Sequence, residues 1–207
     1  MSISRRGFVF GLPLFAAGCA STVTEYSADL LNYGPQPDED FPLGPIPLDR
    51  IPPELRRREV PFDGKYEAGT IVVNTPERRL YYVLGDGRAI RYGIGVGKEG
   101  LQLRGNAVVG RKAKWPNWTP TANMIRRDPR NLRYAGGVPG GPNNPLGARA
   151  LYLYRNGKDT MFRIHGTNQP HTIGQAVSSG CIRMMNHDVI DLYERAKVGT
   201  KVVVIQA

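Results

Sequence analysis

The sequence predicts a mainly β fold with one or two short helices. β-branched and aromatic runs recur from about residue 70 onward, and short turn-forming stretches such as Asn156-Gly157 separate them. Only residues 186–197 show the spacing of an amphipathic helix. At 207 residues, with 41% apolar and 22% charged residues, the chain has room for one globular domain plus a tail.

The predicted elements follow in order after residue 70. Residues 70–74 and 79–84 flank Thr75-Pro76-Glu77 and predict a hairpin. Further strands are expected at residues 88–96, 107–113, 150–154, 161–164 and 201–205. Asn186 is expected to cap the helix, and Gly199 lies just beyond its end.

The first 20 residues predict export. Ser4-Arg5-Arg6-Gly7-Phe8 resembles a twin-arginine signal, and the alternative, an ordinary secretory signal, also exports the protein. Ala16-Ala17-Gly18-Cys19 is similar to a lipoprotein processing site, in which Cys19 would carry a lipid anchor to a membrane; cleavage after Ala20 is the alternative. Either way Cys181 is the one thiol left, in a protein expected in the periplasm or cell envelope.

Two further segments follow the export signal. Residues 21–63 are rich in Pro, Asp and Glu and predict a flexible tether, and residues 64–207 are expected to form the globular domain. Inside that domain, residues 115–145 contain six prolines and predict a long functional loop. Trp118 and Tyr134 favour an ordered loop, although such aromatics can also cover the open end of a sheet.

The globular part is strongly basic. The chain has a formal charge of +10, yet residues 21–55 contain seven acids against Arg50, so the positive charge lies mainly in the domain. Nucleic acid is the usual partner of such a surface, but the chain has no zinc-finger spacing, RNA-recognition signature or basic heptad run. We therefore expect no nucleic-acid partner, and an anionic cell wall or membrane face explains the charge as well.

His165 and Cys181 are the candidate catalytic pair. They lie sixteen residues apart, with Gly166 after the histidine and Gly180 before the cysteine. A thiol near its ordinary pKa of about 8.5 needs a base or a positive field, and a histidine can take its proton and return it to a leaving amine. The amides of Gly180 and Cys181 are candidates for an oxyanion hole, and a carbonyl near Gly166 for orienting the imidazole.

Zinc binding is the rival chemistry for the same residues. His165, His171, Cys181 and His187 are four possible ligands, but their spacings fit none of the common compact ligand pairs. We therefore expect no metal and no cofactor, and interpret His171 and His187 as polar residues of a loop and a helix start.

His165-Gly166-Thr167-Asn168, together with the segment Ser178-Ser179-Gly180-Cys181-Ile182-Arg183-Met184, strongly resembles the signature of L,D-transpeptidases with a YkuD-type catalytic domain. The resemblance extends from about Gly69 to Ile205. It implies a β-sandwich of mixed sheets with the active site under a lid, for which residues 115–145 are the candidate. Ser179 departs from the pattern, since many members have His or Arg there.

The resemblance also implies roles for individual residues. Cys181, His165 and Gly166 would be catalytic, and the oxyanion and substrate-binding residues would be Gly180, Ser178, Ser179, Arg183, Asn168 and Trp118. Cys181 would attack the diaminopimelate–D-alanine bond of a peptidoglycan tetrapeptide stem and form a thioester. An amine would then resolve it, giving a 3–3 cross-link or a wall-attached protein.

Three alternatives stay open. Arg183 suits a stem carboxylate or an internal structural partner equally well. The same thioester would serve a hydrolase that uses water as the acceptor. From a different class, the domain would be a non-catalytic wall-binding module with an inert thiol.

Overall fold

The structure is a computed structural model that describes residue 28 and residues 31–97, 103–178 and 180–206. The predicted export signal, including Cys19, lies outside these residues. The strands are β1 (Arg58–Pro61), β2 (Ile71–Asn74), β3 (Arg79–Gly85), β4 (Arg88–Gly93), β5 (Val96–Gly97), β6 (Gly105–Lys114), β7 (Arg149–Arg155), β8 (Lys158–His165), β9 (Ala176–Ser178), β10 (Ile182–Arg183) and β11 (Lys201–Ile205). The helices are η1 (Leu48–Arg50), η2 (Pro53–Leu55), α2 (Ala122–Arg127), η3 (Pro129–Tyr134), η4 (Pro170–Thr172) and α3 (Asn186–Arg195).

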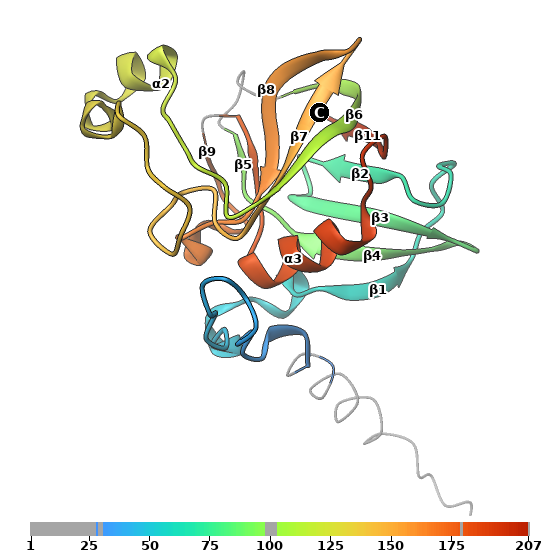
Figure 1. Cartoon of the computed structure of the whole chain (residues 1–207). Coiled ribbons are helices and arrows are strands. Elements are labelled where there is room, and N and C mark those ends of the chain that lie inside the picture. The colour runs from blue at the N-terminus through green and yellow to red at the C-terminus, as the bar shows by residue number, and fades with distance from the viewer. Residues whose placement is uncertain (1–27, 29–30, 98–102, 179, 207) are drawn as a thin grey trace, which may run out of the picture.

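Nine strands form one mixed sheet in the order β1-β4-β3-β2-β11-β6-β7-β8-β10, and β5 pairs with β9 separately. Within the large sheet only β11–β2 and β10–β8 are parallel pairs. Figure 1 shows the β6–β8 part running steeply across the β2–β4 part, with α3 beside them. The mainly β fold with mixed pairing and few short helices is therefore confirmed.

The predicted hairpins form where the turn residues indicate. β2 and β3 pair with Ile71 opposite Tyr82, and β7 and β8 are joined by Asn156 and Gly157, both with positive φ. α3 contacts β7 and β8, and its Val189 and Leu192 are fully buried in the main core. No helix in the described part of the chain is long and apolar enough to cross a membrane.

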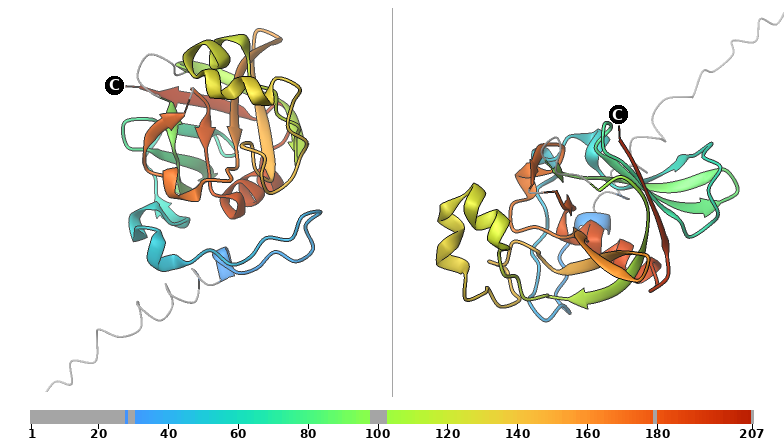
Figure 2. Two further views of the ribbon diagram at one scale, coloured as in Figure 1. Left: turned by 90° about the vertical axis from the view of Figure 1, so that its left-hand side faces the viewer. Right: turned by 90° about the horizontal axis from the view of Figure 1, so that it is seen from above.

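The N-terminal segment differs from the expected tether. Of residues 21–63, the structure describes residue 28 and residues 31–63, and β1 in this stretch pairs antiparallel with β4 at the edge of the sheet. Tyr33 is 1% exposed, and it forms a second apolar cluster with Ile51, Leu55 and two residues of the domain. Figure 2 shows the segment, blue to cyan, running along the side of the domain that carries α3.

Residues 21–63 have too few apolar side chains to build a core of their own, and for that reason their composition predicts a tether. The described stretch instead places a few apolar side chains on a surface that the domain supplies, where Ile173 and Met185 lie. A few well-placed residues suffice when most of the buried area belongs to the partner surface.

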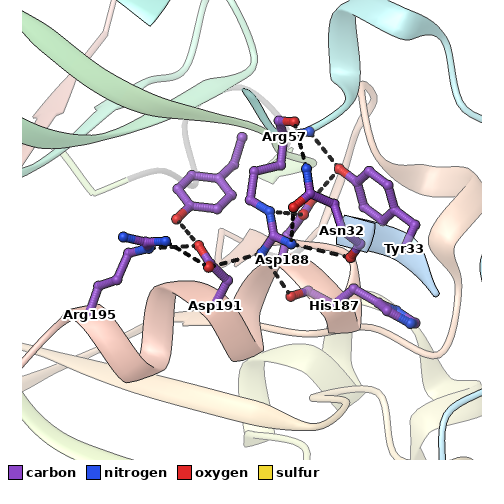
Figure 3. A network of polar contacts seen from close by, with 8 residues as sticks. Asn32, Tyr33, Arg57, His187, Asp188, Asp191 and Arg195 are labelled. Carbon is purple, nitrogen blue, oxygen red and sulfur yellow. Dashed lines mark hydrogen bonds and ion pairs between the residues drawn. The ribbon is translucent and has the colours of Figure 1, made fainter. Parts of the chain in front are cut away.

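Polar contacts also attach this segment to α3, as Figure 3 shows. The Tyr33 hydroxyl donates to Asp188 Oδ2 over 3.3 Å. Beyond the contacts drawn there, His187 Nε2 lies 2.8 Å from Gly34 O. The Arg57 guanidinium lies 3.2 Å from Asp191 Oδ1. The N-terminal segment is therefore held by both the start and the middle of the helix.

Asp188 and Asp191 have opposite electrostatic environments in this network. Burial raises the pKa of Asp188 to about 7. The charge of Arg57 opposes this only weakly, because Arg57 Nε is 3.9 Å from Asp188 Oδ1, too far for a hydrogen bond. Burial acts in the same direction on Asp191, but hydrogen bonds from Arg195 and the charge of Arg57 hold the pKa of Asp191 below its usual value.

We expect Asp188→Asn to gain stability relative to the wild type as the pH rises. A folded-state pKa raised from 3.8 to about 7 means that the folded protein binds the extra proton, so the wild type loses stability between about pH 4 and pH 7. The difference should grow by up to about 4 kcal/mol over this window. Urea unfolding at pH 4, 5, 6, 7 and 8 measures it.

Asp191→Asn is the matched control. The pKa of Asp191 is depressed, so its carboxylate stabilises the fold above about pH 4 and that contribution is lost only below. The difference in unfolding free energy between Asp191→Asn and the wild type should therefore stay constant from pH 5 to 8. Parallel pH profiles for the wild type and Asp188→Asn would show that Asp188 is ionised in the fold, contrary to the expectation.

Candidate active site

The structure brings His165 and Cys181 to one cavity. His165 is the last residue of β8, and Cys181 immediately precedes β10. Because β10 runs parallel to β8 with Arg183 opposite His165, the chain returns along the strand that carries the histidine. Both side chains line a cavity of about 1350 Å³. Two residues sixteen positions apart thus share one site.

The backbone carbonyl of Gly166 determines the tautomer of His165. His165 Nδ1 lies 2.6 Å from Gly166 O, and a carbonyl oxygen only accepts hydrogen bonds, so Nδ1 carries the proton and Nε2 keeps its lone pair. Burial, together with the charge of Arg183, lowers the pKa of His165 to about 4. At neutral pH the imidazole is therefore uncharged and able to accept a proton.

Cys181 is a protonated thiol in the protein without substrate. Burial raises its pKa, against the lowering influence of a hydrogen bond from the Arg163 backbone and of the Arg163 and Arg183 charges. Its Sγ lies 4.0 Å from the carbonyl oxygen of Met161. The site therefore starts as a neutral thiol and a neutral imidazole, and a proton transfer between them would accompany attack.

We expect alkylation of Cys181 by iodoacetamide to be slow at pH 7. The rate should increase about tenfold per pH unit until the pH passes the raised thiol pKa, because only the thiolate reacts. Intact-mass measurement of the rate from pH 6 to 10 tests this, with a peptide of residues 178–184 as the control, whose rate should level off near about pH 8.5. A plateau below pH 8 in the protein would contradict it.

Two glycines fit closely together beside Cys181. Gly180 has a φ of 124°, and a Cβ added to Gly97 would lie 2.5 Å from the Gly180 Cα. The backbone of β5 therefore presses directly on the residue before the cysteine. Sequence reasoning missed Gly97, although the close spacing of glycines from Gly93 onward could have indicated a tight backbone approach. Ser179 lies outside the described residues, and Ser178 is the last residue of β9.

Arg183, Asn168 and Trp118 all line the same cavity. Arg183 lies 3.5 Å from Gln169 Oε1, and its buried Nε has no partner among the described residues. Asn168 donates to the backbone carbonyl of Asn143 over 3.0 Å. The structure thus places every side chain of the predicted site that it describes around one space. Among the described residues, the Arg183 guanidinium has no carboxylate partner.

The expected lid, residues 115–145, forms a wall of the cavity. Thr121 caps α2 by accepting from the Met124 amide over 3.2 Å, and Asp128 caps η3 in the same way. The two short helices project from the sheet beside β5 and β9 in Figure 1. Trp118 packs edge-on against Tyr134 with ring centroids 5.8 Å apart.

A buried asparagine holds the base of this wall. Asn144 is 0% exposed, and its amide nitrogen lies within 3.0 Å of the carbonyl oxygens of Pro116, Val138 and Pro139. Its Oδ1 accepts from the Leu146 amide over 2.8 Å. One side chain therefore ties together both ends of the projecting segment, which explains how a stretch with six prolines can be ordered.

The cavity is strongly cationic. One aspartate, Asp128, lines it beside six arginines: Arg111, Arg127, Arg130, Arg133, Arg163 and Arg183. Arg130 and Arg163 have carboxylate partners in Asp128 and Asp159. Sequence reasoning missed this grouping, although Arg127, Arg130 and Arg133 lie within the loop that the sequence predicts to be functional.

The alternative zinc site gains no support. His187 Nε2 contacts Gly34 O rather than facing the cavity. The described residues contain no group of three His, Cys, Asp or Glu side chains that could hold a metal ion.

Comparison with known proteins identifies the family to which this chain belongs. Residues 68–204 match the YkuD profile, described as the L,D-transpeptidase catalytic domain. In Escherichia coli K12, "Probable L,D-transpeptidase ErfK/SrfK" is 42% identical over 65% of this chain and 43% of that protein. "Probable L,D-transpeptidase YbiS" of the same organism is 37% identical over 84% of this chain and 55% of that protein. The chain thus spans about half the length of the curated relatives it matches.

A solved structure is also similar. The crystal structure of a protein from Brucella melitensis, described as "Probable carnitine operon oxidoreductase caia", is 52% identical and covers 75% of this chain and 96% of that one, with a TM-score of 0.51. The YkuD profile covers well over half of the sequence and includes both halves of the His165–Cys181 site. The chain therefore belongs to the L,D-transpeptidase family with the YkuD-type catalytic domain.

Proposed function

We propose that this protein is an exported cysteine L,D-transpeptidase that acts on peptidoglycan tetrapeptide stems through a thioester on Cys181. The observation that carries the proposal is the pairing, in one cavity, of the thiol with an imidazole whose Nε2 is left unprotonated because Nδ1 donates to the Gly166 carbonyl. The proposed location is the periplasm or cell envelope, with a lipid anchor if Cys19 is processed as a lipoprotein cysteine.

The proposed reaction has two balanced steps. Cys181 Sγ gives its proton to His165 Nε2 and attacks the carbonyl between diaminopimelate and the terminal D-alanine. Collapse of the tetrahedral intermediate breaks the C–N bond, and His165 returns the proton to the departing D-alanine amine. An acceptor amine then attacks the thioester, loses a proton to His165, and releases the thiol. The Gly180 and Cys181 amides are the proposed oxyanion donors.

The charge of the cavity supports a stem peptide as the substrate. A tetrapeptide stem carries several carboxylates, and six arginines line the space into which it would bind. Arg183 is the proposed partner of the carboxylate nearest the reacting bond, because its guanidinium is partly buried without an acidic partner among the described residues.

The decisive experiment is product analysis with and without an acceptor. The purified domain is incubated with disaccharide tetrapeptide alone, and then with an added diaminopimelate-bearing acceptor or a lysine peptide. The proposal predicts loss of D-alanine and a new amide to an added amine, seen by mass. Tripeptide as the product regardless of acceptor would identify a hydrolase, and no product and no thioester would identify a wall-binding module; either result would overturn the proposal.

A further inference from the structure

Asn186 lies at the start of α3 but does not cap it, contrary to the prediction from sequence. Met185 occupies the cap position of α3, and no side chain caps the helix. The Asn186 Oδ1 instead accepts from two amides outside the helix, that of Ala148 over 3.0 Å and that of Thr167 over 3.1 Å. One oxygen therefore joins the loop before β7 to the loop after β8.

The Thr167 amide is chemically linked to the catalytic histidine. Thr167 N–H and Gly166 C=O are the two polar ends of one planar peptide unit, so holding one end fixes the direction of the other. The Gly166 carbonyl is the group that accepts from His165 Nδ1 over 2.6 Å. A continuous chain of contacts thus runs from Asn186, through a single rigid peptide, to the imidazole.

Two glycines leave the space that the Asn186 oxygen occupies. A Cβ added to Gly147 or to Gly166 would lie 2.2 Å from Oδ1 in either case. Gly147 also has a φ of 62°, which disfavours other residues. Both glycines flank the two amides that bond to Asn186. Gly166 is therefore needed for the close approach of Asn186 as well as for its own carbonyl.

We propose that Asn186 is the positioning residue that completes the His165–Cys181 pair, acting through the Gly166–Thr167 peptide. If that peptide turned, His165 Nδ1 would lose its acceptor, and the tautomer with the proton on Nε2 would become populated. That tautomer cannot take the Cys181 proton. The inference rests on the proposed function, because it assigns His165 the role of base. Loss of the partner that orients a metal-bound histidine typically costs about 10- to 100-fold in activity, and we expect a loss of the same order here.

The test uses three variants. Asn186→Leu removes the acceptor at similar size, and Asn186→Asp keeps an acceptor oxygen at a helix start, where a negative charge is favourable. Thr75→Val is the matched control for lost stability, because the buried Thr75 donates a part-buried hydrogen bond from Oγ1 to Ile205 O in a different part of the sheet. The readouts are ¹⁵N NMR of the His165 ring and the rate of thioester formation.

We expect Asn186→Leu to shift His165 away from the Nδ1-protonated tautomer and to slow thioester formation about 10- to 100-fold. Asn186→Asp should recover most of the rate, and Thr75→Val should leave both readouts unchanged. An unaltered His165 spectrum in Asn186→Leu, with a rate within twofold of Thr75→Val, would overturn the inference while leaving the proposed function intact.

The wild type supplies a measurement that does not depend on how the variants fold. Its His165 should show a protonated Nδ1 and an unprotonated Nε2 at pH 7, and the opposite tautomer would overturn the inference. If wild-type protein forms no thioester at all, the proposed function fails, and the ¹⁵N spectra of the wild type and Asn186→Leu still decide whether Asn186 orients the imidazole.

Discussion

Cys181→Ala is expected to reduce thioester formation and cross-linking to background, a loss of about 10⁴-fold or more. No other free thiol is expected in the mature chain, because Cys19 is either lipidated or removed. The fold should survive, because the thiol is neutral and its contact with Met161 O is long, at 4.0 Å. Activity is measured by mass on tetrapeptide substrate, and stability by thermal unfolding of the same preparations.

Cys181→Ser separates the nucleophile from the shape of the site. Its hydroxyl fills nearly the same space, but its much higher pKa makes it a poor nucleophile beside a histidine whose own pKa is about 4. We expect slow or absent turnover and a melting temperature within a few degrees of the wild type. Turnover by Cys181→Ala comparable to the wild type would refute the thioester mechanism outright.

Local patterns predicted the elements that local chemistry determines. The Asn156-Gly157 turn with flanking alternation predicts β7 and β8, and both residues adopt the positive φ that such a turn requires. The meeting of His165 and Cys181, the candidate catalytic pair, was predictable for a similar reason. A histidine at a strand end and a lone cysteine after a glycine are read from short stretches, and parallel pairing of β10 with β8 then brings them together.

The parts that were missed depend on contacts across the fold. An asparagine at a helix start equally well predicts a helix cap, and only the close approach of Gly166 and Gly147, 20 and 39 residues earlier in the chain, assigns its oxygen to other amides. The arginines of the cavity come from separate elements, including β6, η3 and β8. Their grouping follows from how those elements pack, and the composition of the chain carries no information about that packing.

Contacts across the fold also explain the N-terminal segment, whose proline- and acid-rich composition predicts a flexible tether. Glu39 is a partner for Arg149, which is 2% exposed at the start of β7. Two hydrogen bonds of 2.6 and 2.8 Å join the guanidinium to the two carboxylate oxygens, and Trp115 Nε1 donates to Glu39 over 3.1 Å. An acid far away in sequence thus neutralises a buried cation at the base of the cavity wall.

Glu39→Ala is therefore expected to destabilise the protein by about 3–5 kcal/mol, the usual cost of leaving a buried charge without its partner. Hydrogen bonding to Arg149 lowers the pKa of Glu39, so this contribution is present at neutral pH and lost as the pH falls through the folded-state value. Urea unfolding at pH 7 and pH 3 should show a large difference from the wild type at the first pH and a small one at the second.

The double variant Glu39→Leu/Arg149→Met tests whether the effect comes from the unpaired charge. Removing both partners leaves no buried charge, so the double variant should be more stable than Glu39→Leu alone, although it contains one more substitution. Equal or greater instability of the double variant would mean that Arg149 stabilises the fold through its other contacts, the carbonyl of Ala148 and the ring of Tyr193. With the pair intact, the segment once predicted to be a tether is part of what holds the active-site wall in place.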